Sequence, residues 1–140
     1  MGRNEMKSKW MLIIICGALL MPALAMGNSY EGSVQSFTCI TQGKVCPVGR
    51  EDPMIAAERV FVLHVKAGEY YFIPNLDRAI LARHLNQMVK VEGVMSDQFN
   101  AIKARDIYVM NDGKWVKTWS QNWQDEVFNE ITKGVPLGGS

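Results

Sequence analysis

Several short segments of the chain alternate apolar and polar residues, a pattern typical of β-strands. The clearest runs from Arg59 to Lys66, where apolar side chains fall on both faces and predict a strand buried on both sides. A turn at Gly68 leads into Tyr70 to Ile73, and Pro74 ends this next strand because proline cannot donate to a ladder. Alternation also predicts strands over residues 32–40, 88–95, 101–110 and 114–119.

A glycine within the strand at 88–95 predicts an irregularity in pairing. Gly93 interrupts the alternation, which is typical of a bulge or a sharp bend. The following strand changes its alternation near Asp106. We therefore expect a register change there, with these side chains facing inward: Ile102, Ala104, Ile107 and Val109.

Two segments have helical rather than strand periodicity. Asn75 or Asp77 can cap a helix of about three turns. Its apolar stripe consists of Ile80, Leu81, Ala82 and Leu85. Trp123, Val127 and Ile131 stand four residues apart and predict a C-terminal amphipathic helix that packs on the strands. Three tryptophans, at 115, 119 and 123, are expected at the seam between the last strand and this helix, with Trp115 and Trp119 on one strand face.

The first 25 residues have the three parts of a secretory signal. Three basic residues precede an apolar run that starts at Trp10, and Ala23 and Ala25 supply small residues at a cleavage site. The alternative is a retained membrane anchor, but Pro22 interrupts the run and a span needs about 20 strongly apolar residues. We expect cleavage after Ala25, a periplasmic or secreted protein, and no stable membrane anchor afterwards. Cys16 would leave with the signal.

Composition agrees with one small domain. The 140 residues leave no room for two typical domains. Removing residues 1–25 changes the formal charge from +1 to −1, so the sequence gives no strong sign of nucleic-acid binding. We expect a flexible leader over 26–33, a domain over 34–133 and a tail over 134–140.

Two cysteines, Cys39 and Cys46, remain after signal removal. An even number of cysteines in an oxidising compartment indicates a disulfide, here closing a short loop. A metal site or a thiol-redox pair is the alternative. Zinc sites show two close cysteine pairs and redox motifs space their cysteines by two, and neither pattern is present.

The order of predicted elements is three strands, a helix, two strands, an extra edge strand and a helix. Residues 90–94 followed by 101–108 are similar to the fourth and fifth strands of small OB-fold domains, and the resemblance covers about residues 32–110. It implies a mainly β, five-stranded Greek-key barrel with a helix between strands three and four. The chain also resembles small exported bacterial OB-fold proteins of uncharacterised function. The cysteine-containing loop and the absence of basic excess differ from nucleic-acid-binding members.

OB-type barrels bind ligands on strands two and three and on adjoining loops, here 41–57 and 96–100. The ligand-binding candidates are therefore Tyr70, Tyr71, Phe72, His64 and Phe99. Exposed aromatic rings there would stack on a sugar, a base or a peptide side chain. The competing interpretation is that alternate members of the run from Tyr70 to Ile73 fill the core, as strand geometry requires.

Motifs for catalysis are missing from the sequence. No serine lies in a nucleophile elbow, and phosphate loops, zinc helices and calcium loops are absent. His64 and His84 fit hydrogen-bonded structural histidines better than metal ligands. We therefore expect no catalytic residue, metal or cofactor, and a non-catalytic exported binding or accessory module that recognises a partner protein or small ligand. The alternative is a metal-binding or thiol-redox protein that uses Cys39 and Cys46.

Overall fold

The computed structural model of the chain describes residues 27–134. The expected signal segment and residues 135–140 of the expected tail lie outside this range. Within it, no helix combines the length and hydropathy needed to cross a bilayer.

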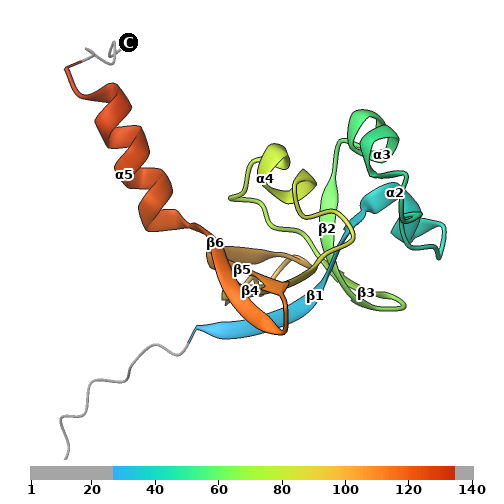
Figure 1. Cartoon of the computed structure of the whole chain (residues 1–140). Coiled ribbons are helices and arrows are strands. Elements are labelled where there is room, and N and C mark those ends of the chain that lie inside the picture. The colour runs from blue at the N-terminus through green and yellow to red at the C-terminus, as the bar shows by residue number, and fades with distance from the viewer. Residues whose placement is uncertain (1–26, 135–140) are drawn as a thin grey trace, which may run out of the picture.

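Six strands form one antiparallel sheet in the order β3-β2-β1-β4-β5-β6 (Figure 1). Their bounds are Asn28–Ser36 for β1, Phe61–Lys66 for β2, Glu69–Tyr71 for β3, Met88–Met95 for β4, Ile102–Asn111 for β5 and Lys114–Ser120 for β6. The mainly β prediction is confirmed. β1 starts earlier than expected, inside the predicted leader, because residues 28–33 pair with β4 while residues 33–36 pair with β2.

Between residues 27 and 134, four short helices interrupt or extend the sheet. They are α2 (Phe37–Thr41), α3 (Glu51–Ala57), α4 (Arg78–Ala82) and α5 (Gln121–Thr132). α2 lies where strand was expected, because the Ser36 hydroxyl accepts the Cys39 N–H at 3.3 Å and caps a helix. α4 is capped by Asp77, one of the two expected caps, whose carboxylate accepts the Ala79 N–H at 2.7 Å. It has 5 residues and is shorter than expected.

The expected irregularity at Gly93 is present. The register of β4 and β5 shifts between Glu92 and Gly93, so that Arg105 has no partner opposite it. A Cβ on Gly93 would lie 2.2 Å from the Lys103 carbonyl oxygen, which only glycine avoids. The shift turns the predicted inward set toward the core: Ile102, Ala104, Ile107 and Val109 are all buried.

The sheet is open, with β3 and β6 at its edges, so the expected closed five-stranded barrel is not confirmed. The segment after β3 nevertheless meets β5 through a parallel bridge between Phe72 and Ala101. The Phe72 N–H donates to the Asn100 carbonyl at 2.9 Å, and the Ile102 N–H donates to the Phe72 carbonyl at 2.8 Å. Beyond Phe72 the chain is no longer a strand, but the side-chain amide of Asn75 continues the contact with β5 through hydrogen bonds.

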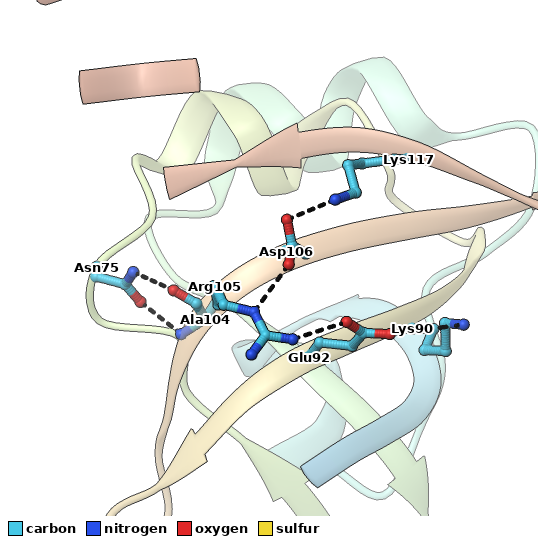
Figure 2. Close-up of polar contacts among 7 residues, drawn as sticks. All are labelled: Asn75, Lys90, Glu92, Ala104, Arg105, Asp106 and Lys117. Atoms are coloured by element: carbon cyan, nitrogen blue, oxygen red, sulfur yellow. Dashed lines mark hydrogen bonds and ion pairs between the residues drawn. The ribbon is translucent and has the colours of Figure 1, made fainter. Parts of the chain in front are cut away.

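Asn75 pairs with the backbone of Ala104 as a strand residue would (Figure 2). Its Nδ2 donates to the Ala104 carbonyl at 2.7 Å and its Oδ1 accepts the Ala104 N–H at 2.9 Å. The same Nδ2 donates to Oε1 of Gln121, the first residue of α5, at 3.1 Å. One side chain therefore joins the segment after β3, the first part of β5 and the start of α5.

The prediction that the C-terminal helix packs on the strands is wrong. α5 follows β6 without a loop and projects away from the sheet (Figure 1), and none of its residues is buried. The expected common face of Trp115 and Trp119 is also wrong. The register of β5 and β6 shifts between the pairs Ile107 with Trp119 and Tyr108 with Lys117, which turns Trp119 into the core while Trp115 stays outside.

Replacing Asn75 with alanine leaves the buried N–H and carbonyl of Ala104 without partners. We expect Asn75→Ala to lower the free energy of unfolding by about 1–3 kcal/mol, the cost of unpaired buried polar groups. Urea denaturation followed by far-UV circular dichroism measures the change. Asn129→Ala, on the exposed part of α5, is the matched control and should change stability by less than about 0.5 kcal/mol. Equal losses in both variants would contradict the role given to Asn75.

Candidate ligand-binding face

Three aromatic rings gather on the outer side of β2 and β3, and we call Phe37, Tyr70 and Phe72 the aromatic face. The ring centroids of Phe37 and Phe72 lie 5.3 Å apart, and the ring centroid of Tyr70 lies 5.8 Å from each of them. Tilted and edge-to-face packing at these separations is favourable between aromatic rings. All three rings are only half-buried, so the face remains accessible to a ligand.

Among the residues predicted from sequence, His64 and Phe99 adjoin this face. His64 pairs with Tyr70 across β2 and β3 and is half-buried. Phe99 is 71% exposed in the turn before β5. That turn is attached to β3, because the Asn100 side chain donates to the Tyr70 carbonyl and the Asn100 carbonyl accepts the Phe72 N–H.

Tyr71 does not belong to the aromatic face. Its ring packs against the core, with the Tyr30 centroid at 5.8 Å, and its hydroxyl donates to Glu69 Oε1 at 3.0 Å. Ile73 is buried in the core. Alternate members of the run from Tyr70 to Ile73 therefore do fill the core, while Tyr70 and Phe72 face outward.

A shallow groove of about 360 Å³ continues from Phe72 along the start of β2. Exposed Val60 and Pro74 contribute apolar walls, and Arg59 and Arg78 contribute positive charge. Arg78 is held in place: its Nε donates to the Glu58 carbonyl at 2.9 Å and its guanidinium lies 5.5 Å from the Phe61 centroid. Within residues 27–134 Arg59 forms no ion pair, so its charge is available at the groove.

Phe37 and the two arginines were missed by sequence reasoning. Phe37 falls in a predicted strand, Arg59 begins the predicted strand 59–66, and Arg78 lies outside the apolar stripe of the predicted helix, so none of them is predicted to bind a ligand. Only the high β-propensity of the neighbouring run from Tyr70 to Ile73 pointed to this face.

The carboxylate of Glu58 holds the chain on both sides of this face. It accepts the Ser36 hydroxyl and the Thr38 N–H, the latter at 2.9 Å, and it accepts the N–H of Val60 at 3.0 Å. The Phe37 N–H in turn donates to the Val60 carbonyl at 2.9 Å. Burial acts to raise the pKa of Glu58, but the hydrogen bonds from Ser36, Val60 and Thr38 outweigh it and lower the pKa to about 2.

The expected disulfide is not formed in this structure, where Cys39 and Cys46 are free thiols. The Cys46 sulfur accepts the Ser36 N–H at 3.1 Å, and the Cys46 N–H donates to Gln35 Oε1 at 2.6 Å. Burial is the main cause that raises the pKa of Cys46 to about 11, so its thiol stays protonated and weakly nucleophilic at neutral pH.

The two histidines lie on different elements and do not meet the cysteines. His84 Nδ1 lies 2.9 Å from Gln87 Oε1, and its Nε2 lies 3.3 Å from the Thr118 hydroxyl. No group of three or more histidine, cysteine, aspartate or glutamate side chains between residues 27 and 134 is arranged to hold a metal ion. The metal-binding alternative gains no support from this geometry.

A second polar cluster lies on β4, β5 and β6, away from the aromatic face (Figure 2). Buried Asp106 accepts from Lys117 Nζ at 2.8 Å and from Arg105 Nε at 2.9 Å, and Arg105 Nη2 reaches Glu92 at 3.0 Å. Burial acts to raise the pKa of Asp106, yet the hydrogen bonds from Lys117 and Arg105 lower it overall. Because each carboxylate here is matched by a cation, the cluster stabilises the sheet.

Comparison of the chain with protein-family models, curated proteins and solved structures found no significant match. The candidate face therefore rests on its own geometry.

The ionised form of Glu58 stabilises the fold, so stability should depend on pH. The pKa is 4.5 ordinarily and about 2 in the folded chain, so this contribution of about 3 kcal/mol is present above pH 4.5 and is lost as pH falls toward 2. We expect Glu58→Gln to remove most of it at pH 7, so that the difference in unfolding free energy from the unsubstituted chain shrinks on acidification. Urea denaturation at a series of pH values measures this difference.

Glu31→Gln, at an exposed carboxylate on β1, is the matched control. A constant difference between Glu58→Gln and the unsubstituted chain from pH 7 to pH 2 would contradict the assignment.

Proposed function

We propose that this chain is a non-catalytic binding module of the OB type that holds a ligand on the aromatic face. The observation that carries the proposal is the half-buried but accessible cluster of Phe37, Tyr70 and Phe72 beside a groove lined in part by Arg59. The strand order and the parallel contact between Phe72 and Ala101 support an OB-type barrel. Ligands of such barrels bind the same two strands and the adjoining loop.

The chemistry of the face favours a ligand with a planar or apolar part and an anionic group. Aromatic rings stack on planar groups, and guanidinium pairs well with carboxylate. A segment of a partner protein or a small ligand meets both requirements. Single-stranded nucleic acid meets them too, but a chain with net charge −1 after removal of residues 1–25 lacks the basic excess for strong phosphate binding.

We further propose that the protein is exported, with residues 1–25 as a cleaved signal, and acts in the periplasm or outside the cell. In that oxidising environment Cys39 and Cys46 would join in a disulfide. The even number of cysteines that remains after removal of Cys16 supports this pairing. The thiol-redox alternative needs a thiolate at neutral pH, and the raised pKa of Cys46 works against it.

Ligand binding is tested with indole-3-acetate, which carries a planar ring and a carboxylate, and with its uncharged amide. We expect indole-3-acetate to shift the amide NMR signals of Val60, Phe72 and Phe99 at millimolar concentration, and the amide to bind several-fold more weakly. Phe99→Ser should weaken binding by about tenfold or less, as loss of one stacking contact predicts. Phe128→Ser, at a similarly exposed phenylalanine on α5, should leave binding unchanged.

Shifts confined to other surfaces, or none at several millimolar, would refute the binding face. A thymidine hexanucleotide is the third probe. Tight binding of this probe that falls steeply with salt would assign the face to nucleic acid instead.

The disulfide is tested by counting thiols in protein purified from the oxidising compartment and unfolded without reductant. We expect no reaction with maleimide before reduction and two modified cysteines after it. Reduction should lower stability by up to about 2–3 kcal/mol in the unsubstituted chain and by nothing in Cys39→Ser. Two reactive thiols together with a bound metal would favour the metal or redox alternative.

A further inference from the structure

α5 carries an apolar stripe that the described chain leaves largely exposed, although Lys117 Nζ of β6 lies 5.9 Å from the Trp123 centroid at its start. Its members are Trp123 (48% exposed), Val127 (58%), Phe128 (57%) and Ile131 (72%). Contiguous exposed apolar patches of this kind mark interaction surfaces on small soluble proteins. The rest of the helix surface carries Asp125, Glu126 and Glu130, the last of them at the edge of the stripe, and no basic residue occurs in α5.

The junction with β6 prevents this stripe from folding back onto its own sheet. Ser120 ends β6 and α5 begins at Gln121, so no loop residue lies between them. The first turn is also anchored: Gln121 accepts from Asn75 at 3.1 Å, and Trp119 Nε1 donates to Gln124 at 3.0 Å. The direction of the helix is thus set by the body, and the cover must come from outside this molecule.

The outer side of β4 to β6 has the chemistry that the stripe and its acids require. Lys90 Nζ lies 4.5 Å from the Tyr108 centroid and 5.3 Å from that of Trp115, and Lys117 Nζ lies 5.3 Å from Tyr108. We call these four residues the lysine-aromatic face. Lys90 and Lys117 pair with Glu92 and Asp106 of the sheet, whereas exposed Lys114 at the start of β6 forms no ion pair within residues 27–134 and leaves this side with a free positive charge. An apolar helix with acidic flanks is complementary to aromatic rings bordered by lysines.

We propose that two copies of this chain exchange α5, each laying its helix across the lysine-aromatic face of the other. Such an exchange is isologous, so both stripes are covered at once and the assembly closes as a dimer. The 12 residues of α5 extend about 18 Å, enough to cross three strands spaced about 4.8 Å apart. The acidic side of α5 disfavours the alternative of an anionic lipid surface, which attracts basic helices. The proposal does not depend on the ligand-binding function.

The first experiment measures the mass of the purified protein by light scattering over a range of concentrations, with its N-terminus determined by mass spectrometry. We expect a reversible dimer. The pair Val127→Gln with Ile131→Gln should weaken dimerisation by at least about tenfold, and Asn129→Gln, on the polar side of the same helix, should not. A monomer up to about 100 µM, or a dimer insensitive to the apolar pair, would overturn the proposal.

The second experiment identifies what each α5 contacts. Zero-length carbodiimide cross-linking of an equal mixture of unlabelled and ¹⁵N-labelled protein should yield mixed-isotope peptides that join a lysine of β4 to β6 to an acid of α5. Lys114→Glu should weaken the dimer, and Lys44→Glu, at an exposed position in the loop between α2 and α3, should not. Cross-links only within one chain would indicate that the helix folds back, and a dimer indifferent to Lys114→Glu would indicate helix-to-helix pairing. Either result overturns the exchange.

Discussion

The pairing of Asn75 with Ala104 is the contact on which the arrangement of both exposed surfaces depends. Pro74 cannot donate to a ladder, so β3 ends early and the segment after it cannot continue alongside β5 as a strand. The amide of Asn75 replaces the missing strand because it offers a donor and an acceptor at one end of one side chain. Its second bond, to Gln121, extends the same constraint to α5. The aromatic face on one side and the direction of the helix on the other both follow from it.

Glu58 plays the corresponding role at the start of β2. A buried carboxylate is costly unless hydrogen bonds satisfy it, and here a hydroxyl and backbone N–H groups from both flanking segments do so. Ser36 and Thr38 lie on either side of Phe37 in the chain. The hydrogen bonds from these two residues stabilise the Glu58 carboxylate and also orient the ring of Phe37 between them. The aromatic face thus depends on the buried, ionised carboxylate of Glu58. Protonation of this carboxylate at acidic pH limits the stability of the face.

Local sequence signals predicted the elements that depend on local energetics. Alternation located the strands from β2 to β6, Asp77 marked the start of α4, and Gly93 marked the bulge. The errors arose where contacts with residues distant in sequence determine the local structure. Residues 28–33 are polar and glycine-containing, but they form strand because both β2 and β4 supply hydrogen bonds to β1. Similarly, Phe37 joins Tyr70 and Phe72 only through a turn capped by Ser36, a tertiary arrangement that alternation does not encode.

α5 shows the limit of periodicity most directly. Its spacing of apolar residues correctly indicated an amphipathic helix, and from this spacing we expected its apolar side to be buried against the strands of the same chain. Periodicity indicates that one side of a helix is apolar, but it does not indicate which surface covers that side. In the body of this chain cations and carboxylates neutralise one another within the sheet, whereas the three acids of α5 have no basic neighbour in the helix. An amphipathic helix whose apolar side stays about half or more exposed in its own fold has the surface that an intermolecular contact would bury.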